Sequence, residues 1–138
     1  MSATTMHVTT PANDGLSRSR ALGVAGAVLA AVAVWAVAVP ILGISLLIRF
    51  GNGAPQGVGL PAVAGGSLVL SLLGLGLLIA LEKLTANARE IWTIVAAVAL
   101  AASMGLPIVA GTTQEAVGVL ALMHVVAGAV LIPALRRR

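Results

Sequence analysis

The chain has 138 residues, of which 59% are hydrophobic and only 9% are charged, and it contains no cysteine. Soluble domains carry about 25% charged residues, so a water-soluble fold of this length could not cover so much apolar surface. The lack of cysteine excludes disulfides, thiolate metal sites and the four-helix membrane oxidoreductases that pass electrons through paired cysteines.

Four long segments carry no Asp, Glu, Lys or Arg, and each has at least 20 residues. A helix of about 20 residues crosses the ~30 Å hydrocarbon core of a bilayer. The sequence therefore predicts an all-α, four-helix transmembrane bundle in residues 18–138. The expected spans are approximately residues 21–45, 60–81, 90–111 and 115–135.

The basic residues follow this topology, and the net charge of +4 is no sign of nucleic-acid binding. Seven of them flank the spans on one side and only Arg49 lies on the other; the seven are Arg18, Arg20, Lys83, Arg89, Arg136, Arg137 and Arg138. The positive-inside bias then places both termini and the 82–90 turn in the cytoplasm of a multi-pass protein of the plasma (inner) membrane.

The N-terminal residues 1–17 are polar and rich in turn formers, so we expect a disordered cytoplasmic tail. The apolar segment after it has 28 residues, too long for the ~7–15-residue core of a cleaved signal peptide. Small residues at intervals of three and four favour a helix–helix seam: Gly23, Gly26, Ala30 and Ala33. Trp35, about opposite them, should face lipid or a partner, and Pro40 should kink the helix.

The external connection, residues 49–60, is rich in glycine and proline. Its flanks, residues 44–50 and 56–60, could pair as short strands. In the next span Ser67, Ser71 and Gly74 share one helical face, and each hydroxyl could bond its own helix or a neighbouring one.

The 82–90 turn carries an expected N-cap pair, Asn87 with Glu90. Glu82 and Trp92 should lie at the membrane interface, where an indole anchors well at headgroup depth. Pro107 should bend the outer end of the third span.

Thr112 and Glu115 form an S/T-x-x-E capping box, which also places Glu115 at an interface and makes spans three and four an antiparallel hairpin. In the fourth span, small residues on one face again favour packing, with His124 at the edge of that face; they are Gly118, Ala121 and Gly128.

His124 is the one ionisable residue deep within a span, which makes it a candidate for function. The structural interpretation is a neutral imidazole that bonds across the bundle, with Ser103, at similar depth, as its partner. A proton relay with Glu115 in the same helix is excluded, because nine residues separate them by ~13 Å and place them on opposite faces.

Ligand types are too few for a metal or cofactor site, so we expect none. Met123 adjoins His124, but adjacent helical residues diverge by about 100°, and a bis-histidine haem would need a second subunit. Every acid lies in the tail or at an interface, unlike the intramembrane carboxylate of small multidrug exporters: Asp14, Glu82, Glu90 and Glu115. No nucleotide-binding loop or catalytic triad is present, so we expect no enzyme.

Arg136, Arg137 and Arg138 end the last span as a topology anchor, and they could also hold anionic lipid headgroups.

The chain also resembles a family of small four-span membrane proteins of unknown function from high-GC Gram-positive bacteria. The likeness covers roughly residues 20–136 and includes AVWAVAVPILGI, QGVGLPAVAGGSL, GLLIALEKLT, AREIWTIVAAVALAAS and ALMHVVAGAVLIPAL. The Trp and Pro of span one, Glu82, Trp92 and the Met-His pair of span four look like features of that family. It carries no assigned activity, so the resemblance implies fold and localisation and nothing about mechanism.

Packing faces are abundant and reactive groups are scarce, which favours a non-enzymatic interaction or accessory subunit. Its partners would be the lipid bilayer and either itself or another membrane protein. The alternative is a small oligomeric transporter or pore with His124 lining the pathway. A His-ligated cofactor protein is the third hypothesis, and absorption spectra with elemental analysis would test it.

Overall fold

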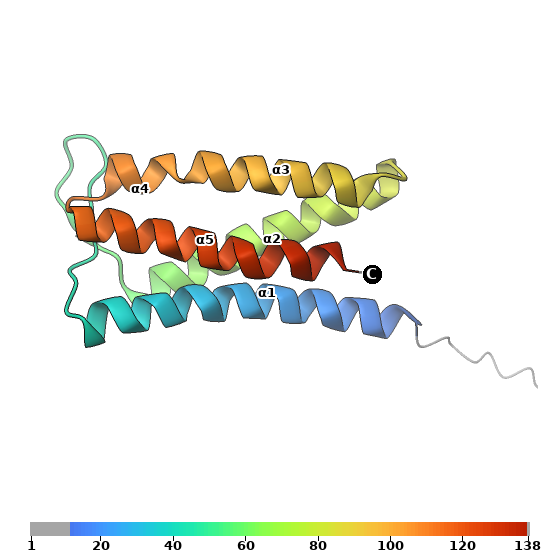
Figure 1. Ribbon diagram of the computed structural model, residues 1–138, viewed down its shortest axis with the longest axis horizontal. Coiled ribbons are helices and arrows are strands. Elements are labelled where there is room, and N and C mark those ends of the chain that lie inside the picture. Colours follow the sequence, from blue (N-terminus) through green and yellow to red (C-terminus); the bar gives the residue numbers. More distant parts are fainter. Residues whose placement is uncertain (1–11, 138) are drawn as a thin grey trace, which may run out of the picture.

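The computed structural model describes residues 12–137 and confirms the all-α prediction (Figure 1). Four helical segments in it are long and apolar enough to cross a membrane: Gly15–Ile41, Leu60–Leu84, Ala88–Ala110 and Gln114–Arg136. The first of these combines most of α1 (Ala12–Ala36) with the π-helical turn that follows it. Because α1 begins at Ala12, helix covers residues 12–17, which the sequence assigned to the tail. The rest of that expected tail, residues 1–11, lies outside the described residues.

The helices run up and down, so that α1 begins and α5 (Gln114–Arg136) ends at the same end of the molecule (Figure 1). We call this the terminal end and the opposite one the loop end. Helix α1 packs on α5 and on α2 (Leu60–Leu84), while α3 (Ala88–Ser103) packs on α2 and α5.

Small residues let α1 and α5 pack closely along a seam. A Cβ added at Gly23 would lie 2.8 Å from Ala134 Cβ, and one at Gly26 would lie 3.2 Å from Val130 Cγ1. The small-residue face was therefore predicted correctly at its glycines. The prediction was wrong at Ala33, which is exposed, whereas Ala31 is buried.

Two prolines lie where the helices lose regular α geometry, and a proline favours such irregularity because it has no N–H to donate. Pro40 lies in a π-helical turn, η1 (Val37–Ile41), which follows α1. Pro107 cannot donate to the carbonyl of Ser103, and the helix breaks at Met104 before it resumes as α4 (Gly105–Ala110).

The connection between η1 and α2 forms a small antiparallel hairpin, which confirms the expected strand pairing. Strand β1 (Leu47–Ile48) pairs with β2 (Gln56–Gly57). Trp35 Nε1 donates to the Val58 carbonyl over 2.9 Å, and its ring packs on a buried cluster. The prediction that Trp35 faces lipid or a partner is therefore wrong, because its N–H finds an acceptor at the end of this hairpin.

The expected helix caps need two corrections. Asn87 precedes α3 as predicted, but its side chain caps nothing. Thr113, not Thr112, is the N-cap of α5, and its hydroxyl accepts from Ala116 N over 3.1 Å. Thr112 instead donates to the carbonyl of Leu47, which ties the α4–α5 turn to the hairpin.

Buried side chains gather in two clusters, one toward each end. The loop-end cluster consists of Ala31, Leu46, Val63, Ala116 and Met123. The terminal-end cluster consists of Leu78, Trp92 and Leu135.

Candidate functional site

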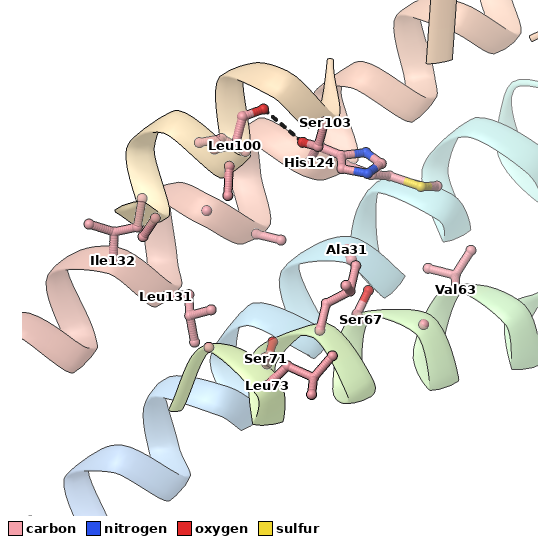
Figure 2. Close-up of a pocket in the computed structure, with 18 of the residues that line it drawn as sticks. Ala31, Val63, Ser67, Ser71, Leu73, Leu100, Ser103, His124, Leu131 and Ile132 are labelled. Carbon is pink, nitrogen blue, oxygen red and sulfur yellow. Dashed lines mark hydrogen bonds between the residues drawn. The ribbon is translucent and has the colours of Figure 1, made fainter. Parts of the chain in front are cut away.

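Between the two clusters lies a cavity of about 510 Å³. Side chains of α1, α2, α3 and α5 line it, together with Val58 from the end of the hairpin (Figure 2). Small-molecule sites in proteins typically occupy about 300–1,000 Å³, so the volume suits a small ligand.

The cavity ends at the two clusters. Val63 and Met123 line it toward the loop end, and Trp92 lines it toward the terminal end. Trp92 is only 1% exposed and its Nε1 donates to the Gly74 carbonyl over 2.7 Å, which joins α3 to α2. The indole that the sequence assigned to the membrane interface is thus enclosed by protein.

The mouth of the cavity lies between α2 and α3. Leu70 and Leu73 of α2 line the cavity and are 62% and 65% exposed, and Val95 of α3 lines it and is 42% exposed. In a bilayer these apolar side chains would face lipid, so the cavity opens toward the hydrocarbon.

Four polar side chains stand among otherwise apolar or glycine lining, and no charged residue belongs to the lining within residues 12–137. In Figure 2, Ser67 and Ser71 of α2 form one wall, while Ser103 of α3 and His124 of α5 lie on the opposite side. The sequence placed Ser67 and Ser71 on one helical face but gave no sign that the face borders a cavity.

Ser71 is the buried polar residue of this wall, with 4% of its surface exposed. Its hydroxyl has no hydrogen bond among the described residues, where every buried side-chain nitrogen and oxygen has a partner, so the hydroxyl oxygen is open to the cavity. A helical serine often bonds the carbonyl four residues earlier, so an unbonded hydroxyl on a cavity wall is free to bond a ligand.

His124 and Ser103 both line the cavity, but the hydrogen bond expected between them is absent. Nδ1 of His124 donates to the Leu120 carbonyl over 2.7 Å, and Ser103 Oγ donates to the Leu100 carbonyl over 2.7 Å. Each side chain bonds a carbonyl of its own helix, because a carbonyl three or four residues earlier is always within reach and does not depend on how the neighbouring helix packs. In a neutral ring with hydrogen on Nδ1, Nε2 is an acceptor.

The other site residues expected from the sequence lie away from the cavity. Glu82 forms ion pairs with Arg20 and Arg89 at the terminal end. Glu115 is exposed in the first turn of α5, and Arg136 and Arg137 are exposed where the last helix ends. Arg138 lies outside the described residues. The described part of the chain holds no group of three or more metal-ligating His, Cys, Asp or Glu residues.

Comparison with known proteins identifies a family for this chain, but that family has no assigned activity. A search of curated proteins and a search of solved structures found no match. The model of a family described as "Family of unknown function (DUF6069)" matches residues 11–138, nearly the whole chain. The chain therefore belongs to the DUF6069 family of unknown function.

Proposed function

We propose that the protein is a non-enzymatic accessory protein of a bacterial plasma membrane, which binds a small lipid-soluble molecule in the cavity. The observation that carries the proposal is the cavity of about 510 Å³ with its mouth between α2 and α3. A ligand dissolved in the bilayer would enter sideways, without passing through water.

The ends of the cavity favour binding over conduction. Buried clusters stand at both ends, and a water-filled route across the bilayer would have to pass them. The walls are mainly apolar, which suits a ligand from the hydrocarbon phase better than an ion.

The polar groups of the cavity also favour a non-catalytic role. A serine nucleophile needs a base within hydrogen-bond reach, whereas Ser103 donates to a backbone carbonyl. Nδ1 of His124 likewise bonds a backbone carbonyl, that of Leu120, and not a serine hydroxyl.

Two neighbouring glycines of α2 offer a matched test. Gly66 lines the cavity and Gly65 does not, and a Cβ at either would meet nothing within 4 Å. Gly66→Leu should therefore fill the cavity, while Gly65→Leu should leave it open, at the same change in helix propensity.

The measurement is photolabelling of the full-length protein in phosphatidylcholine nanodiscs with a diazirine-bearing hydrocarbon, mapped by mass spectrometry. The informative positions are Met123 and Ser71, which are buried but line the cavity. Labelling at both should fall several-fold in Gly66→Leu and persist in Gly65→Leu. Equal labelling of the two variants would contradict the proposal.

A small oligomeric transporter is the second candidate, and it is favoured by the place of His124 on a cavity wall. In proteoliposomes this alternative predicts a solute or proton flux that His124→Gln abolishes while the protein stays folded. The binding proposal predicts no such flux from the wild-type protein.

A further inference from the structure

We infer that the ligand of the cavity is an uncharged alcohol or phenol, with one hydroxyl group on an otherwise apolar skeleton. The inference rests on the proposed binding function and specifies its ligand. It is carried by the hydrogen-bonding groups of the lining, by their depth and by the absence of charge among them.

The free hydrogen-bonding positions suit a hydroxyl group. Ser71, a residue only 4% exposed, presents to the cavity a hydroxyl that has no hydrogen bond among the described residues. His124 presents Nε2, an acceptor in the neutral ring whose Nδ1 bonds Leu120. A ligand hydroxyl both donates and accepts, so it could bond either wall, whereas a hydrocarbon would offer the Ser71 hydroxyl no partner.

The depth of these groups excludes a lipid headgroup. His124 follows Gln114 by ten residues and precedes Arg136 by twelve, which places it about 15–18 Å from either end of α5. Ser71 lies about 16–20 Å from the ends of α2 by the same rise per residue. The polar part of the ligand must therefore enter the middle of the hydrocarbon.

The charge of the lining excludes ionic ligands. A phosphate, carboxylate or ammonium group is costly at the middle of a bilayer unless a counter-charge faces it. No Asp, Glu, Lys or Arg belongs to the described lining, and the nearest ion pair on α2 is at Glu82, beyond the terminal-end cluster. A single neutral hydroxyl has no such requirement.

The experiment compares two matched probes on the native protein in phosphatidylcholine nanodiscs. One is a long-chain alcohol with a diazirine and a terminal alkyne, and the other is its methyl ether. Both fit the same volume, but only the alcohol donates a hydrogen bond. We expect the alcohol to label cavity positions about five-fold more at equal concentration, the effect of one hydrogen bond.

Variants then locate the preference. Ser71→Ala and His124→Leu should each reduce alcohol labelling toward the level of the ether, while His124→Gln, which keeps an acceptor, should retain part of it. Thr93→Val is the control, because the Thr93 hydroxyl bonds Arg89 in its own helix and does not line the cavity. It should leave the preference unchanged.

The outcomes separate this inference from the proposed function. Equal labelling by alcohol and ether, with both blocked by Gly66→Leu, would overturn the hydroxyl inference and keep the binding site. Labelling that Gly66→Leu does not affect would overturn both. The probe comparison uses the wild-type chain, so its result stands even if a variant fails to fold.

Discussion

Arg20 of α1 and Glu82 of α2 form an ion pair in which one guanidinium nitrogen, Nη2, lies 2.7 Å from both carboxylate oxygens. Arg89 of α3 approaches the same carboxylate at 3.5 Å. The Arg20 and Glu82 side chains are only 16% and 27% exposed, so one acid joins three helices in a partly shielded place at the terminal end.

Glu82→Gln should therefore lower the free energy of unfolding by about 1–2 kcal/mol, as expected for partly buried charged hydrogen bonds. Glu90→Gln is the matched control, since Glu90 lies in the same turn region, is exposed and has no ion pair among the described residues. Thermal unfolding in detergent would measure both. A loss as large for Glu90→Gln as for Glu82→Gln would contradict the assignment.

The indole of Trp92 provides a second test. Trp92→Phe keeps most of the buried ring but removes the N–H that bonds Gly74, so it should cost about 1 kcal/mol. Trp92→Ala should cost about 3–5 kcal/mol because it also leaves a void in the terminal-end cluster. The chain has two tryptophans, so fluorescence of Trp35 alone would follow unfolding of either variant. Equal losses would mean that ring packing is unimportant there.

Two glycine-to-alanine changes should differ in their effect on the free energy of unfolding. Gly23→Ala forces a Cβ within 2.8 Å of Ala134 Cβ and should destabilise the α1–α5 seam. Gly76→Ala meets nothing within 4 Å, so it should be neutral or stabilising by up to about 1 kcal/mol through helix propensity. Unfolding in detergent checks both, and a stabilised Gly23→Ala would show that the seam can separate without loss.

Sidedness can be tested cleanly because the natural chain has no cysteine. The positive-inside bias predicts that the hairpin loop lies outside and the α2–α3 turn inside. A membrane-impermeant maleimide should label Gly53→Cys in intact cells, and Ala86→Cys only after the membrane is opened. The reverse pattern would invert the topology without altering the fold.

The number and position of the spans could be predicted because each depends on local composition. Charge-free runs of sufficient length specify the four helices, and a missing N–H at Pro40 and Pro107 specifies their irregular turns. The strand pairing of the hairpin was also anticipated, because a stretch rich in glycine and proline lies between its two flanks.

Relations between helices could not be predicted in the same way. The orientation of Trp35 and the bonds of His124 and Ser103 depend on which acceptor lies nearest in space. The cavity depends on the angle between α2 and the other helices, for which no single residue is a signal. The sequence therefore identified His124 and Ser103 as candidates but not the space that both border.

The Trp92–Gly74 bond joins α2 to α3 on the terminal side of the mouth. Any swing of α2 away from α3 would then pivot about this bond, so its amplitude would grow with distance toward the hairpin. Such a hinge would widen the mouth for a bulky ligand without disrupting the packing of the terminal-end cluster. The short β-ribbon, held to α1 through Trp35, would set how far the gap can widen.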